Sequence, residues 1–171
     1  MTSKNIFENP FCERILSLTG LIFPFLEINA ILGPKVLCST DNATFNEFFR
    51  ATLVGPISMF YSSQVNHLVA FIVMIFIFDA CVRKTLPLTL FTRFNIIQGI
   101  LLDVICSFLG VTFVQTTYLA RESTFGDLIS NVAYFGVIGF ICYCILVILF
   151  GRYPKIPIIS EGARLNVQIF R

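Results

Sequence analysis

The stretch Arg93-Phe94-Asn95-Ile96-Ile97-Gln98-Gly99-Ile100-Leu101-Leu102-Asp103 opens a long apolar run that ends near Tyr118. From Asn95 onward its polar and small residues, apart from Gln98, recur at spacings of four, four, four and three, and they continue beyond the stretch. This spacing places them on one side of a helix, and the other side is Phe, Ile, Leu and Val. A helix of this kind suits a membrane bundle, with the polar side toward neighbouring helices and the apolar side toward lipid. We call this side the polar face: Asn95, Gln98, Gly99, Asp103, Ser107 and Gly110.

The composition of the whole chain also indicates an integral membrane protein. Hydrophobic residues make up 56% of the 171 positions and charged residues only 13%, whereas a soluble domain carries about a quarter charged residues. The mean hydropathy is +0.84. A net charge of +2 gives no support for a nucleic-acid partner.

Four apolar runs are long enough to cross a bilayer whose hydrocarbon core is about 30 Å thick. We therefore predict an all-α fold, a four-helix membrane bundle forming a single domain over residues 1–171. The predicted spans cover residues 15–32, 65–82, 94–118 and 128–150.

An additional amphipathic helix is expected over residues 45–54, lying along the membrane surface. It carries Phe and Leu on one side and Asn, Glu and Arg on the other, and Gly55-Pro56 should end it. Residues 151–171 form a polar tail, which Pro154 and Pro157 lead us to expect to be extended rather than helical.

Two acidic residues lie within predicted spans. Asp103 follows Arg93 by ten residues, about 15 Å along a helix, which places it near the bilayer midplane. A central Asp costs roughly 2.5–3.5 kcal/mol, so it should be protonated, hydrogen-bonded to another helix or facing water. A structural hydrogen bond and a functional role both remain open for Asp103. For Glu27, a wetted position at the interface and a buried position are equally open.

Small residues and a proline suggest how the other spans are shaped. Pro24 should kink the first span. Residues 130, 133, 136 and 139 of the fourth span are Ser, Ala, Gly and Gly, and their three-residue spacing predicts a seam for close helix packing.

The distribution of basic residues predicts the orientation. With four spans, nine Lys or Arg residues fall on the side that holds both termini, and three fall on the other. The positive-inside rule then places both termini on the cytoplasm-like side. The nine are Lys4, Arg14, Arg83, Lys84, Arg93, Arg152, Lys155, Arg164 and Arg171, and the three are Lys35, Arg50 and Arg121.

Motifs for catalysis or metal binding are not found. The sequence has no Gly-rich phosphate loop, no nucleophile motif with a partnered base, and a single His. None of the six Cys residues forms a pair with the two-residue gap of a metal or redox site. We therefore expect no enzyme activity, no cofactor and no metal.

Two separate motifs, in order, resemble those of a known family. The stretch from Arg93 and Phe94 to Asp103 resembles the pattern Arg-Phe-Asn, two apolar residues, Gln, a small residue, an apolar residue and Leu-Leu-Asp. The tail with Pro157, Ser160 and Glu161 resembles Pro, two apolar residues, Ser-Glu, a small residue and Ala. The first span, with Pro24 and Glu27, also resembles the corresponding helix. The family is the twenty-kilodalton subunit of the translocon at the inner envelope membrane of chloroplasts (TIC).

The resemblance implies a multi-pass protein of the plastid (chloroplast) inner envelope membrane with both termini in the stroma. It implies a core subunit of the protein import translocon, with other translocon subunits, preproteins in transit and the lipid bilayer as partners. Land-plant members carry a cleavable transit peptide, and this chain shows none. That fits a plastid-encoded algal form, and a cyanobacterial relative is the alternative.

Three functions are weighed. As a translocon subunit, the protein would use the polar face to line a translocation path or to pack against another subunit. A four-helix bundle fills its own core, so a path for a peptide needs other subunits or a homo-oligomer. Alternatively, Asp103 could couple ions in a small-solute transporter. The third function is a structural scaffold of a membrane complex.

Overall fold

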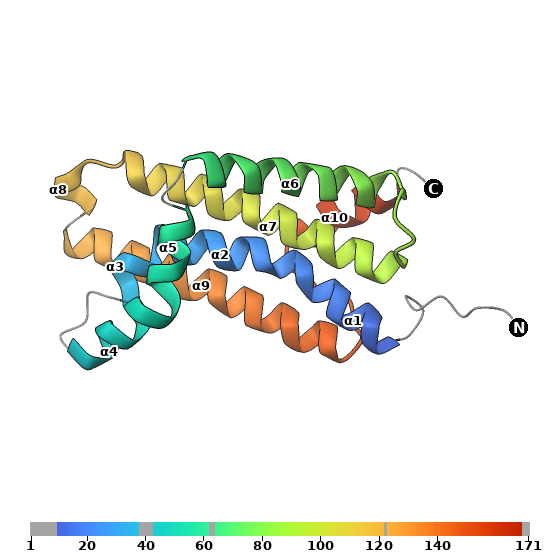
Figure 1. The fold of residues 1–171 in the computed structure, drawn as a ribbon, viewed down its shortest axis with the longest axis horizontal. Helices are drawn as coiled ribbons and strands as arrows, with labels where there is room; N and C mark the ends of the chain where they lie inside the picture. Colours follow the sequence, from blue (N-terminus) through green and yellow to red (C-terminus); the bar gives the residue numbers. More distant parts are fainter. Residues whose placement is uncertain (1–9, 38–42, 62–63, 122, 169–171) are drawn as a thin grey trace, which may run out of the picture. The chain divides into compact units, whose positions relative to one another are not determined.

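The computed structural model describes residues 10–37, 43–61, 64–121 and 123–168, and all regular structure within them is helical. Figure 1 shows the order of the elements along the chain. The all-α prediction is confirmed for these residues. The helices are α1 (Pro10–Leu18), η2 (Thr19–Leu21), α2 (Ile22–Ile31), α3 (Gly33–Leu37), α4 (Ala43–Phe49), η3 (Arg50–Val54), α5 (Gly55–Tyr61), α6 (Gln64–Val82), α7 (Leu90–Gln115), α8 (Tyr118–Arg121), α9 (Thr124–Leu149) and α10 (Ile159–Gln168).

Three of the described helical segments are long and apolar enough to cross a membrane: Pro10–Ile31, Leu90–Gln115 and Thr124–Leu149. They correspond to the first, third and fourth predicted spans. The second predicted span is the helix α6, whose described apolar part, Leu68–Val82, is shorter. That the chain crosses the membrane four times therefore remains a prediction.

The chain divides into two compact units that alternate along the sequence. Unit 1 consists of Met1–Phe23, Ile72–Leu102 and Phe140–Arg171, and unit 2 of Pro24–Phe71 and Asp103–Gly139. The boundaries fall inside α2, α6, α7 and α9, so each of these helices contributes residues to both units.

The core of unit 1 is built by α6, the first half of α7 and α10. Apolar side chains at helical spacing on each of these elements are buried against one another. The cluster therefore holds the C-terminal helix α10 against α6 and α7. Its members are Met74, Cys81, Val82, Phe94, Ile96, Ile97, Ile100, Ala163 and Val167.

The expectation of an extended tail was wrong, because α10 is a helix of ten residues. Ser160 stabilises its start: its Oγ accepts a hydrogen bond from the Ile156 N–H (2.6 Å) and donates one to the Pro154 carbonyl (3.1 Å). Ile159, Ala163 and Val167, spaced by four, are all buried. This apolar stripe is short and has charged residues beside it, so it is a weaker signal for a helix than Pro154 and Pro157 are against one.

The segment predicted as an amphipathic helix is helical, but it does not end at Gly55-Pro56. A π-helical turn, Arg50–Val54, connects α4 directly to α5, which begins at Gly55. The Gly55 N–H reaches the carbonyl of Arg50, five residues back. Pro56 lies in the first turn of α5, where a missing N–H is tolerated. That this segment lies along a membrane surface remains a prediction.

Unit 2 is held together by polar contacts between α2, α3, α9 and the α7–α9 connection. The buried Tyr134 hydroxyl donates to Asn29 Oδ1 at 2.9 Å, and Asn29 Nδ2 donates to the Phe25 carbonyl at 2.7 Å. Lys35 Nζ lies 3.0 Å from an Asp127 carboxylate oxygen and also donates to the Arg121 carbonyl. These contacts fix the start of α9 against α3.

Candidate functional site: the polar face of α7

All six residues of the polar face lie on α7, and most of them are buried. Asn95, Gln98 and Gly99 belong to unit 1, and Asp103, Ser107 and Gly110 to unit 2. Asn95 and Gln98 are 1% exposed and Asp103 is 8% exposed. In the unit 2 half the opposite side of the helix is open, with Val104, Phe108 and Val111 all exposed, whereas residues 91–100 of the unit 1 half are all buried. Two unlike sides are thus present in the second half of α7, and the role of the polar face remains a prediction.

In unit 1 the polar face contains a close helix crossing at Gly99. A methyl group on Gly99 would stand 2.1 Å from the carbonyl oxygen of Gly20, and one on Gly20 would stand 2.6 Å from the Cα of Ile96. Real Cβ atoms do not approach other atoms this closely. Both glycines are therefore needed for the backbones of η2 and α7 to touch.

Pro24 explains the local geometry at this crossing. In a regular helix its N–H would bond to the carbonyl of Gly20, but proline has no N–H. The first span is interrupted there by the 3₁₀ turn Thr19–Leu21. The predicted kink thus corresponds to a break just before Pro24, and it leaves the Gly20 carbonyl beside α7. The role of Gly20 was not predicted, although its position four residues before a helical proline is a usable signal.

Two amide side chains in unit 1 are only partly hydrogen-bonded by described residues. Asn95 Nδ2 donates to the Phe91 carbonyl at 2.9 Å, and Gln98 Nε2 lies 4.0 Å from Cys144 Sγ. Asn95 Oδ1 and Gln98 Oε1 are buried without a donor among the described residues. Leaving such an acceptor without a donor costs about 1–3 kcal/mol, so both oxygens are suited to accept an N–H or O–H.

In unit 2 the polar face brings a hydroxyl and two carboxyl groups close together. Ser107 Oγ donates to Glu27 Oε1 at 2.9 Å, and Asp103 lies one turn earlier on the same side of α7. Glu27 is only 4% exposed, so the interpretation of a wetted interfacial acid was wrong. The Asp103 carboxyl is 8% exposed, and its two alternatives, a structural hydrogen bond and a functional role, both remain predictions.

Gly110 in α7 is closely packed, whereas Gly136 and Gly139 in α9 are not. At Gly110 an added methyl group would stand 2.2 Å from Ile31 Cδ1, so this glycine is a site of close packing in unit 2. At Gly136 and Gly139 nothing described lies within 4 Å of an added methyl group. The predicted small-residue seam of α9 therefore has no packing partner at these two glycines within the described chain.

The two sequence motifs meet in unit 1. The ring of Phe94 packs edge-to-face on Tyr153, with centroids 5.2 Å apart, and Leu101 lies 3.3 Å from a methyl group built on Gly162. The motif in the tail and the motif in α7 are thus two sides of one interface. In the tail motif, Ser160 caps α10, Glu161 is exposed and Pro157 lies in the turn before the helix.

Arg93 links α6 to α7. It is 4% exposed, and its guanidinium donates to the carbonyls of Cys81 (2.6 Å) and Val82 (3.3 Å), the last residues of α6. A cation at a helix C-terminus satisfies carbonyls that have no helical partner and opposes the negative end of the helix dipole. The motif arginine therefore has a structural role that its sequence context did not reveal.

A second polar network joins α1 to the start of α7. The Thr89 hydroxyl donates to a Glu13 carboxylate oxygen, and Thr92 Oγ1 donates to the Glu13 carbonyl at 3.3 Å. Ser17, 0% exposed, lies between these groups and donates to the Glu13 carbonyl at 2.8 Å. None of these residues was singled out from the sequence. Among the described residues there is no group of three or more His, Cys, Asp or Glu that could hold a metal ion.

Comparison with known proteins places these features in a family. Residues 11–163 match the family model described as "Chloroplast import apparatus Tic20-like". The chain belongs to the Tic20-like family. A Tic20 family protein Ycf60 from Gracilaria tenuistipitata var. liui is 32% identical over 160 residues, covering 91% of this chain and 76% of that protein. The Ycf60 protein of Porphyra purpurea is 31% identical and covers 91% and 75%. The family resemblance drawn from the motifs is therefore confirmed.

A cyanobacterial member shows the wider reach of the Tic20 family. The Tic20 family protein of Synechocystis sp. (strain ATCC 27184 / PCC 6803 / Kazusa) is 30% identical over 100 residues, covering 58% of this chain and 62% of that protein. The match to the red algal proteins is thus longer than the match to this bacterial one.

Proposed function

We propose that the protein is a membrane subunit of the protein import translocon of the plastid inner envelope, where it helps preproteins cross into the stroma. The observation that carries the proposal is the Tic20-like match over residues 11–163, which includes the polar face and most of the tail motif. We further infer an algal plastid origin, supported by the coverage of 91% in the red algal comparisons against 58% in the cyanobacterial one.

The same proposal includes a topology. Three described helical segments have the length and apolarity of membrane spans, and α6 would be the fourth. With four spans, the excess of basic residues on the side of the termini favours a stromal location for both ends. Lipid would then contact the exposed apolar sides of α6, α7 and α9.

Within this function the two halves of the polar face would act differently. Gly99 lies against Gly20, so the unit 1 half is a packing surface within the chain. Asp103 in unit 2 is 8% exposed and lies one turn before Ser107, and among the described residues no glycine crossing occupies this part of α7 in the way that Gly20 occupies Gly99. We propose that the Asp103–Ser107 half faces the translocation path or a partner subunit. The chain would act with other subunits or copies, since a single small bundle encloses no wide pore.

Purification of an arrested import intermediate tests this function. A tagged copy of the protein is expressed in plastids, a preprotein fused to a tightly folded domain is stalled during import, and the membranes are solubilised. The proposal predicts that the stalled preprotein co-purifies with the tagged protein, and that a fusion without its targeting segment does not. Equal recovery of both fusions, or of neither, would count against an import role.

A scaffold function is the second candidate, and the Gly20–Gly99 crossing favours it, since that part of the polar face is already occupied. The two functions differ at Asp103. If the residue acts on the path, Asp103→Asn should leave an assembled complex with reduced import. If the protein is only a scaffold, Asp103→Asn should either disrupt assembly or have no effect.

A further inference from the structure

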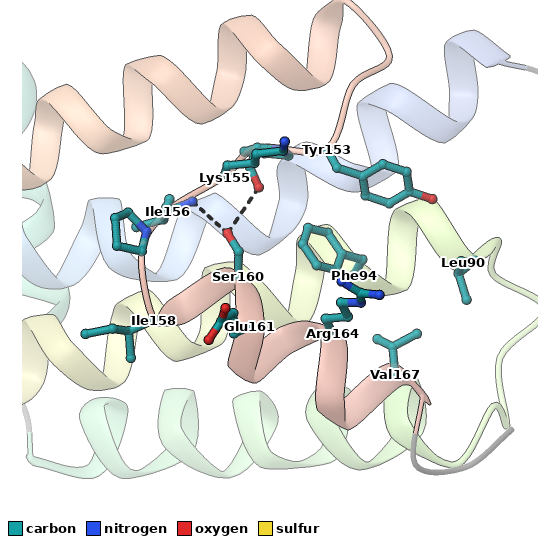
Figure 2. A pocket seen from close by; sticks show the side chains of 12 residues that line it. Leu90, Phe94, Tyr153, Lys155, Ile156, Ile158, Ser160, Glu161, Arg164 and Val167 are labelled. Atoms are coloured by element: carbon teal, nitrogen blue, oxygen red, sulfur yellow. Dashed lines mark hydrogen bonds between the residues drawn. The ribbon is translucent and has the colours of Figure 1, made fainter.

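A pocket of about 630 Å³ lies in unit 1 between the start of α7 and the tail. Figure 2 shows the side chains that line it. Its wall is apolar where Leu90, Phe94 and Ile156 contribute, and its charged groups come from Lys155, Glu161 and Arg164. This volume falls within the range of about 300–1,000 Å³ that is typical of small-molecule sites.

The charges at the pocket favour an anion. Arg164 and Lys155 have exposed side chains and form no hydrogen bond or ion pair through them with any described residue. Figure 2 shows Arg164 on the Phe94 side of α10 and Glu161 on the Ile158 side, so the carboxylate does not cover the guanidinium. A guanidinium in this position can bind a phosphate or sulfonate oxygen through two parallel N–H groups.

The described part of unit 1 carries a net positive charge. Its described residues include seven basic and three acidic ones. Arg83 is paired with Asp79, and Arg14 and Arg93 bind backbone carbonyls. Lys155 and Arg164, by contrast, are exposed and line the pocket.

The position of the pocket indicates that the anion is the headgroup of a membrane lipid. Leu90 and Phe94 are in the first turns of α7, and Tyr153 follows the end of α9, so the pocket lies where two membrane-capable helices leave the membrane. Burial, with a contribution from Glu13, raises the pKa of the Tyr153 phenol. The hydroxyl therefore keeps its proton at neutral pH and can donate a hydrogen bond. A lipid headgroup would meet these groups while its chain stayed in the bilayer.

The turn before α10 offers a contact for such a chain. Ile158 is 84% exposed and has a φ of 66°, a left-handed conformation that is unfavourable for a β-branched residue. Backbone strain of this kind persists where the surroundings require it and is concentrated at functional sites. An acyl chain is the partner that this apolar, exposed side chain would fit.

We propose that this pocket binds an anionic membrane lipid, with Arg164 and Lys155 on the headgroup and the wall of Leu90, Phe94 and Ile158 on the acyl chain. The bound lipid would hold the tail helix against α7 at the membrane surface. The proposal concerns a lipid site and does not depend on the import function.

The test measures lipid retention by the purified full-length protein with native mass spectrometry, using phosphatidylglycerol and phosphatidylcholine of identical chains. We expect phosphatidylglycerol to bind several-fold more tightly. Arg164→Gln should reduce its affinity about tenfold, as loss of a charge-assisted hydrogen bond would, and Lys155→Gln should reduce it less. Lys84→Gln is the matched control, because Lys84 is exposed in the same unit but does not line the pocket.

Three results would overturn the proposal. The first is equal affinity for the two lipids. The second is a fall in phosphatidylglycerol affinity in Lys84→Gln as large as the fall in Arg164→Gln. The third is displacement of the bound lipid by millimolar glycerol phosphate or by an acidic peptide. A phosphatidylglycerol with a photoreactive group near its headgroup provides a second test on the unaltered protein. Adducts should map to residues 90–94 and 153–167, and adducts confined to other segments would also contradict the proposal.

Discussion

The carbonyl oxygen of Gly20 lies directly against Gly99, so close that a methyl group on Gly99 would stand 2.1 Å from it. This relationship joins the break in the first helix to the centre of the polar face. It depends on three residues at once, because Pro24 releases the Gly20 carbonyl from its usual helical bond and neither glycine can be replaced without separating the helices.

Gly99→Ala and Gly20→Ala should each destabilise the protein, by about 1–3 kcal/mol or more, because the added methyl group meets backbone atoms that cannot move aside. Thermal unfolding in detergent measures the effect. Gly136→Ala is the control, since nothing described lies near it, and it should be neutral or slightly stabilising. Equal melting temperatures for Gly99→Ala and Gly136→Ala would disprove the close crossing.

Arg93→Gln should destabilise the connection between α6 and α7. The change removes charged donors from the buried carbonyls of Cys81 and Val82, at a cost of about 1–3 kcal/mol for unsatisfied buried groups. Arg83→Gln serves as the comparison, because Arg83 forms an exposed pair with Asp79 and such pairs contribute little. The capping role is wrong if the two variants unfold at the same temperature.

Ser107→Ala should cost about 1–3 kcal/mol, because it removes the hydrogen bond that the Ser107 hydroxyl donates to the buried carboxylate of Glu27. Thr112→Ala on the same helix removes an exposed hydroxyl bonded to the Phe108 carbonyl, and it should change stability by less than about 0.5 kcal/mol. Glu27→Gln should be milder than Ser107→Ala, since the amide oxygen can still accept the bond. Chemical unfolding of the three variants in mixed micelles would check this order.

Val167→Asp should detach the tail helix, because Val167 is buried in the core of unit 1. Leu165→Asp on the same helix is the control, since Leu165 is 58% exposed. Limited proteolysis should cleave the tail rapidly in Val167→Asp only. Similar cleavage of both variants would show that α10 does not pack as described.

The residue pattern was enough to predict the helical class and to place Asn95, Asp103 and Ser107 on one helix, because a four-residue period is a direct consequence of helix geometry. It was not enough for α10, where Ile159, Ala163 and Val167 form a stripe too short to outweigh two prolines. Gly136 and Gly139 share the spacing of a packing seam, yet spacing alone does not say whether a partner is present. Gly20 and the Arg93 cap depend on contacts between distant segments, which no local pattern records.

Site-specific photocrosslinking during arrested import is the most direct test of the proposed function. A photoreactive residue is placed at Ser107 on the polar face, and at Phe108, which is 71% exposed on the opposite side of α7, as the control. The account predicts adducts to the labelled preprotein from position 107 and not from position 108. Adducts from position 107 only to other membrane subunits would contradict a place on the translocation path and would favour the scaffold function.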